Sequence, residues 1–109
     1  MAYQHQLNGS NINYISQANW QQPVVDQSLN LIAVHSRHWR LIWTANVMPV
    51  ATWDVLNAAR GTAVSVMGPP HDNQNSDYIT YYDARLDAVD GQHEGLNVVG
   101  VRAEFLVKV

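Results

Sequence analysis

The C-terminal stretch "LNVVGVRAEFLVKV", residues 96–109, limits what this chain can fold into more than any other feature. From residue 99 onward, an apolar side chain occupies every second position. These residues are Val99, Val101, Ala103, Phe105, Val107 and Val109. Successive side chains of a β-strand point to opposite faces of a sheet, whereas a helix repeats about every 3.6 residues. We therefore predict a long strand that buries one face of an antiparallel sheet.

Two other long stretches alternate in the same way. In "HWRLIWTAN", residues 38–46, the predicted inner side comprises Trp39, Leu41, Trp43 and Ala45. In "YITYYDARLDAV", residues 78–89, one side comprises Tyr78, Thr80, Tyr82, Ala84, Leu86 and Ala88. Both stretches are predicted to form half-buried strands, because one side of each carries most of the bulky side chains.

Shorter apolar runs and turn residues complete the pattern. "SLNLIAV" at 28–34 and "TAVSVM" at 62–67 predict two further strands. A turn at Ser36-Arg37 would join the first of these to the tryptophan-rich strand, and "DGQHEG" at 90–95 has the composition and length of a hairpin connection. No helical crossover separates these strands, so the sheet is expected to be antiparallel.

One short helix is expected over about residues 52–60, in "TWDVLNAARG". Thr52 is a suitable N-cap, and Gly61 suits the left-handed position that follows a helix. A helix of roughly two turns is too short to be stable alone. It is therefore expected to pack on the sheet through Trp53, Leu56 and Ala59.

These elements predict a mainly β protein, an antiparallel β-sandwich or curled sheet with one short α-helix. The 109 residues suffice for about one domain. Residues 23–109 are assigned to a single β-rich domain, and the amide-rich residues 1–22 to an extended N-terminal arm or a disordered tail. The predicted core residues are Trp39, Leu41, Trp43, Trp53, Leu56, Val101 and Phe105.

Charge and composition exclude several classes of protein. The net charge is −3, and five arginines and one lysine are spread along the chain, whereas nucleic-acid binding needs clustered basic residues. There is no cysteine, no apolar run long enough to span a membrane and no signal-peptide pattern at the N-terminus. Charged residues make up only 14%, against about a quarter in typical domains. Such a surface protects poorly against association, which favours a protein that works among partners.

Metal and cofactor sites are not predicted. His35 and His38 have an odd spacing, which on one strand points their side chains to opposite faces. The chain has no HExxH motif and no paired Cys/His spacing. The glycine at Gly68 opens no helix, so its loop lacks the usual phosphate-binding geometry. We expect no metal and no cofactor.

Catalytic constellations are equally weak. Ser65 lies within a predicted strand and lacks the GxSxG turn that exposes a nucleophile. Asp83 and Asp87 would share a strand face, as a glycosidase pair would require, but Arg85 between them indicates charge compensation on a solvated face. We expect no enzymatic activity.

Aromatic residues outside the predicted core allow two interpretations. The candidates are Trp20, Tyr78, Tyr81 and Tyr82. Tyrosine and tryptophan bury a large area at small entropic cost, so these residues are favoured as a subunit interface. The alternative is a stacking platform for carbohydrate, with nearby Asn and Asp side chains binding hydroxyl groups.

The order of the elements resembles a viral protein family. A strand "HWRLIWTANV" leads into the helical "PVATWDVLNAARG", then "TAVSVMGPP", a loop and the closing strand "GVRAEFLVKV". This order resembles the small minor tail proteins, and the N-terminal domain of distal tail proteins, of long-tailed bacteriophages. The resemblance covers about residues 28–109 and consists of length, element order and a few apolar positions.

The resemblance implies a non-enzymatic structural subunit of a virion, a tail or tail-tip ring component that mediates assembly. Its partners would be copies of itself and other tail proteins, and its location the virion, assembled in the host cytoplasm. The family has no catalytic residues to transfer to this chain. A neck or capsid-decoration protein and a receptor-binding carbohydrate-recognition module remain the alternatives.

Overall fold

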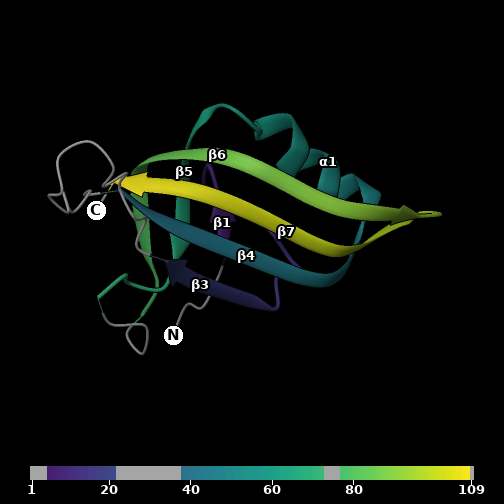
Figure 1. Ribbon diagram of the computed structural model, residues 1–109, viewed down its shortest axis with the longest axis horizontal. Helices are drawn as coiled ribbons and strands as arrows, with labels where there is room; N and C mark the ends of the chain where they lie inside the picture. Colours follow the sequence, from purple (N-terminus) through teal and green to yellow (C-terminus); the bar gives the residue numbers. More distant parts are fainter. Residues whose placement is uncertain (1–4, 22–37, 73–76, 109) are drawn as a thin grey trace, which may run out of the picture.

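One antiparallel sheet carries the fold. The computed structural model describes residues 5–21, 38–72 and 77–108, and within them the sheet order is β2-β1-β5-β6-β7-β4-β3 (Figure 1). The elements are β1 (Gln6–Leu7), β2 (Ser10–Asn11), β3 (Gln17–Gln21), β4 (His38–Pro49), α1 (Val50–Ala59), β5 (Ala63–Gly68), β6 (Ile79–Glu94) and β7 (Asn97–Lys108). The predicted class, mainly β with a curled sheet and one short helix, is confirmed. The strand expected at 28–34 and the turn at 36–37 lie outside the described residues.

The sheet curls because the chain joins its two edges through a short segment. β2 ends at Asn11 on one edge and β3 begins at Gln17 on the other. An extended chain covers at most about 3.6 Å per residue, so this segment reaches about 20 Å. Strands lie about 4.8 Å apart, so the edges of a flat sheet of this order would be about 29 Å apart. The sheet is accordingly a half-barrel (Figure 1).

Extra residues in β6 and β7 bend the sheet. β6 has one more residue than β5 between Tyr81 and Ala84, and one more than β7 between Leu86 and Ala88. β7 has its own extra residue beside Gly100, whose φ of 60° lies in the left-handed region. Such bulges increase the local twist and bend the strand that carries them. The bulges therefore supply the curvature that brings the two edges of the sheet toward each other.

The bulges also correct two predicted strand faces. Tyr82 was expected on the same face as Ala84, but its side chain is 83% exposed while Tyr81 is buried. Val98 is buried in place of the expected Val99, which is half-buried. In both places one inserted residue shifts the alternation, so a strict period of two predicts the wrong face beyond it.

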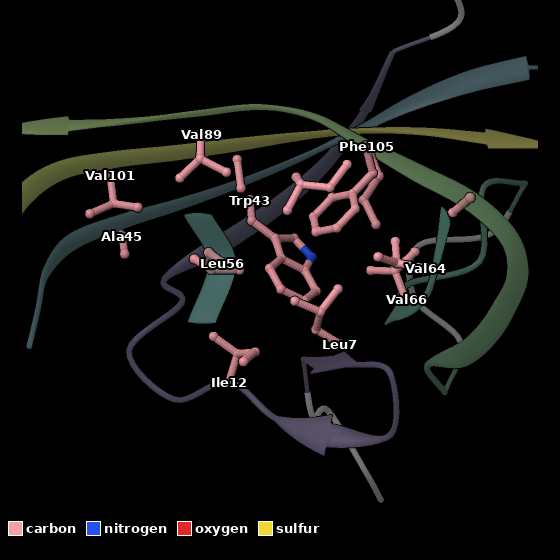
Figure 2. Close-up of a cluster of buried hydrophobic side chains, with 14 of the residues drawn as sticks. Leu7, Ile12, Trp43, Ala45, Leu56, Val64, Val66, Val89, Val101 and Phe105 are labelled. Carbon is pink, nitrogen blue, oxygen red and sulfur yellow. The ribbon is translucent and has the colours of Figure 1, made fainter. Parts of the chain in front are cut away.

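The hydrophobic core lies on the concave face of the sheet (Figure 2). Trp43 and Phe105 pack edge to face, with ring centroids 4.7 Å apart. Of the predicted core, five residues are buried, namely Leu41, Trp43, Leu56, Val101 and Phe105. Trp39 and Trp53 are only half-buried: Trp53 packs against the core from α1, and Trp39 lies outside the core, near the start of β4.

Helix α1 begins earlier than its sequence suggests. Pro49, not Thr52, occupies the N-cap position, and no side chain caps the helix. The Val50 N–H instead donates to the Leu96 carbonyl at 3.0 Å, so the tip of the β6–β7 hairpin binds the first amide of the helix. At the other end Gly61 has a φ of 80°, as predicted for a left-handed residue after the helix.

Residues 5–21, the described part of the segment expected to form an extended arm at 1–22, contribute three strands to the sheet. Asn8 and Gly9, with φ of 52° and 83°, form the two-residue turn between β1 and β2. Positive φ at both central residues is the signature of a type I′ hairpin. Leu7 and Ile12 are 3% and 5% exposed and lie beside Trp43 (Figure 2), because the curled sheet leaves apolar surface for them to cover.

Candidate functional site

Four rings from distant parts of the chain meet in one place, which we name the aromatic cluster: Trp20, Trp39, His71 and Tyr81. The centroids of Trp20 and Tyr81 are 5.1 Å apart, as are those of Trp39 and His71. Trp20 is on β3, Trp39 on β4 and Tyr81 on β6, and His71 follows β5. Because β7 and β4 separate β6 from β3 in the sheet, only its curvature brings these rings together.

Hydrogen bonds hold two of the rings in place. Trp20 Nε1 donates to the Pro69 carbonyl at 2.7 Å. The Tyr81 hydroxyl accepts from the His71 backbone N–H at 2.9 Å, and it lies 3.3 Å from His71 Nδ1. Burial raises the pKa of Tyr81, so the phenol keeps its proton and can donate it to Nδ1. The cluster is therefore preorganised before any ligand arrives.

Gly68 lets the chain approach the sheet before the cluster. A Cβ at this position would lie 3.2 Å from Leu41 Cδ2, tighter than ordinary van der Waals contact. Pro69 and Pro70 follow and are both buried. The sequence "GPPH" thus places His71 against Tyr81, a role that its loop-like composition alone does not reveal.

The other two rings retain free polar atoms. Trp39 and His71 are half-buried, and among the described residues neither Trp39 Nε1 nor His71 Nε2 has a hydrogen-bond partner. An aromatic ring with adjacent ring nitrogens suits a ligand that combines an apolar face with hydroxyl groups. This combination supports the binding of such a ligand.

The candidate interface residues do not form one surface. Trp20 and Tyr81 belong to the aromatic cluster. Tyr81 is only 8% exposed, so its ring is buried within the protein and offers little surface to another subunit. Tyr78 is half-buried beside His5, with ring centroids 5.3 Å apart. Tyr82 projects outward at a bulge. The shift in register within β6 separates side chains that strict alternation would group.

The acidic residues considered for catalysis, Asp83 and Asp87, are exposed to solvent. Arg85 Nε lies 2.5 Å from Asp87 Oδ1, and this exposed pair raises the pKa of Arg85. Ser65 donates its backbone N–H to Asn8 Oδ1 at 3.0 Å, within the β5 strand. Across residues 5–21, 38–72 and 77–108, no group of three or more histidine or acidic side chains is placed to hold a metal ion.

The β3 strand is the second feature of the site, and we name it the open edge: Gln17–Gln21. Within the described parts of the chain its one sheet neighbour is β4. Three amide side chains are exposed along it, and Ala18 and Trp20 are half-buried. Sheet edges are normally protected by charges, proline or bulges, and this strand contains none of these. Because Trp20 is on it, the open edge is continuous with the aromatic cluster.

Comparison with family models, curated proteins and solved structures gave no match to this chain. In the described segments, no helix is long and apolar enough to cross a bilayer.

Proposed function

We propose that this protein is a non-enzymatic structural subunit that assembles with copies of itself, as a tail or tail-tip ring component of a phage virion. The observation that carries the assembly function is the open edge, five residues of strand without a charge or a proline. An unprotected edge presents backbone N–H and C=O groups to another chain, and pairing with that chain satisfies them.

Exposed apolar side chains outside the open edge also support assembly. Val47, Val55 and Leu96 are exposed, and Leu96, at 87%, lies at the tip of the β6–β7 hairpin. The Val50–Leu96 backbone bond ties this tip to the start of α1. The β6–β7 hairpin protrudes from the molecule (Figure 1), and an exposed leucine at its tip favours contact with a further protein. A subunit with the open edge and this hairpin tip can join more than one neighbour.

The viral assignment rests on the order of elements. An aromatic strand, a short helix, a second strand and a closing alternating strand correspond to β4, α1, β5 and β7. This is the order in which the chain resembles tail proteins. A neck or capsid-decoration role would use the same kind of surfaces, and the location within a particle separates these roles.

The assembly proposal is tested on the purified protein. We expect mass photometry and analytical ultracentrifugation to show oligomers that grow with concentration, and negative-stain imaging to show defined assemblies. A protein that stays monomeric up to its solubility limit would contradict the proposal. Immunogold labelling of virions tests the location, with label expected on the tail, whereas label on the capsid alone would overturn the tail assignment.

The aromatic cluster favours carbohydrate recognition as a second candidate function. Trp39 presents a half-buried ring beside His71, and neither Trp39 Nε1 nor His71 Nε2 has a hydrogen-bond partner in the described part of the chain. A sugar would stack on the indole and hydrogen-bond to the ring nitrogens.

A glycan array tests this second function. An aromatic contact contributes about 0.5–1.5 kcal/mol, so Trp39→Ala should weaken glycan binding by roughly two- to tenfold. Tyr82→Ala is the matched control, since Tyr82 is exposed and lies outside the cluster. Binding that survives Trp39→Ala in a folded variant, or silence of the wild-type protein on the array, would count against carbohydrate recognition.

A further inference from the structure

The open edge has amide side chains at its first, third and fifth positions, so this pattern reads the same in both chain directions. Its sequence "QANWQ" places amide side chains at Gln17, Asn19 and Gln21, with Ala18 and Trp20 between them. When two copies of such a strand run antiparallel about Asn19, each Gln17 faces Gln21 of the second copy. Asn19 then faces its own equivalent, and Ala18 faces Trp20 of the second copy.

We propose that two copies of this chain pair antiparallel through β3, in the register centred on Asn19. The pairing continues each sheet across a two-fold axis. The partner of the open edge is then a second copy of the same strand. This inference rests on the proposed function, assembly through copies of the chain.

The outer faces of the paired strands complement each other. The side chains of Gln17, Asn19 and Gln21 are exposed, so they are available to a neighbour. A side-chain amide has both a donor and an acceptor, and two facing amides can therefore hydrogen-bond in either orientation. Amide opposite amide is thus a favourable pairing at each of these positions.

The inner faces fit by size. Trp20 is large and its indole is fixed by the hydrogen bond from Nε1 to the Pro69 carbonyl. Ala18 opposite it is small, so the axis does not require two indoles to occupy the same space. Both residues are half-buried in the single copy, so part of their surface remains for the second copy to cover.

The absence of charge on β3 is compatible with pairing between two copies. A two-fold axis sets residues opposite their own equivalents, and like charges directly opposite are destabilising. β3 contains no charged residue, whereas the long strands β6 and β7 carry ion pairs, Arg85–Asp87 and Arg102–Glu104. No like charges therefore face each other when two copies of β3 pair about the two-fold axis.

The symmetry of this contact limits its product. An isologous pairing closes at two copies. A larger ring would need a second contact, for which Val47, Val55 and Leu96 are exposed. The dimer through β3 is then a building unit of the assembly.

The absence of cysteine allows a direct test with single-cysteine variants. Residues opposite each other in antiparallel strands have Cα atoms about 4.5–5.5 Å apart, within the roughly 4.4–6.8 Å that a disulfide spans. Asn19→Cys should therefore cross-link to its own equivalent. In Gln17→Cys, the two cysteines would be offset by four residues, about 13 Å, and should not cross-link. The double variant Gln17→Cys/Gln21→Cys should cross-link again.

The rate of disulfide formation under mild oxidation is read on non-reducing gels. Paired thiols have an effective concentration near millimolar, so at micromolar protein Asn19→Cys should cross-link at least about tenfold faster than Gln17→Cys. Asn19→Lys sets like charges opposite each other and should dissociate the dimer in mass photometry. Because Asn19 is exposed, the far-UV circular dichroism spectrum of the Asn19→Lys variant should match that of the wild type.

The outcomes separate this proposal from the proposed function. If Asn19→Cys cross-links no faster than Gln17→Cys while the wild-type protein still forms oligomers, the β3 pairing is wrong and assembly stands. If the wild-type protein is monomeric at every concentration, both are overturned. An Asn19→Lys variant that assembles like the wild type also overturns the β3 pairing.

Discussion

At the scale of single residues, His5 places a titratable ring against the core. Its imidazole packs edge-on to Trp43 and Tyr78, with centroids 5.6 Å and 5.3 Å away. His5 Nε2 is buried and has no hydrogen-bond partner among the described residues. Burial lowers the pKa of His5 below its ordinary value of 6.5, because the charged form loses its hydration.

The lowered pKa makes stability depend on pH in one direction. Below pH 6.5 the unfolded chain takes up a proton at His5 more readily than the folded protein does. The contribution of neutral His5 is complete above pH 6.5 and is lost as the pH falls through the lower, folded pKa. We expect the free energy of unfolding to decrease as the pH falls below 6.5, and His5→Leu to remove part of that decrease.

Urea unfolding at a series of pH values measures this effect. His93→Gln is the control, since it also removes a histidine, but from the exposed part of the β6–β7 hairpin. It should leave the decrease in place. A His5→Leu variant whose stability falls with acid as steeply as that of the wild type would contradict the assignment to His5.

At the scale of elements, the β1–β2 hairpin shows how a two-residue turn places a strand. Asn8 and Gly9 have positive φ, and Asn8 bonds β5 through its N–H to the Ser65 carbonyl and through Oδ1 to the Ser65 N–H. The turn thus fixes the register that sets Leu7 opposite Val66. Leu7 reaches the core only in that register.

Substitution of Gly9 tests the turn. Its φ is 83° and a Cβ would meet no atom within 4 Å, so any loss of stability comes from the backbone alone. A left-handed conformation costs an L-residue about 1–2 kcal/mol, and we expect Gly9→Val to lower the free energy of unfolding by about that amount. Gly9→Asn should cost much less, because asparagine tolerates positive φ. Equal stability of the Val and Asn variants would rule out this turn conformation.

At the scale of the whole molecule, the curl of the sheet assembles the aromatic cluster beside the open edge. The segment between β2 and β3 draws the sheet edges together, and the resulting curl brings β3 and β6 into contact through Trp20 and Tyr81. Among the described residues β3 is an edge because it is the last strand in the sheet order. The bend therefore accounts for the aromatic cluster, and the strand order accounts for the open edge beside it.

Local patterns in the sequence determined the fold class, the helix and most of the core. Alternation predicted the buried faces of β4 and the end of β7, since Leu41, Trp43 and Phe105 are all buried. The Asn8-Gly9 pair, a strong hairpin signal, also lay in the sequence, but the amide-rich composition around it suggested an arm. These features need only neighbouring residues, so the sequence suffices for them.

Only the tertiary structure decided where the alternation breaks and which distant residues meet. The bulges near Tyr82 and Gly100 arise from mismatched strand lengths across the sheet, which no single strand reveals. The contact between Trp20 and Tyr81, on strands that β7 and β4 separate, depends on the curl of the whole sheet. Pairing energies between strands far apart in the chain set both, whereas a strand's own periodicity reports only which of its faces is apolar.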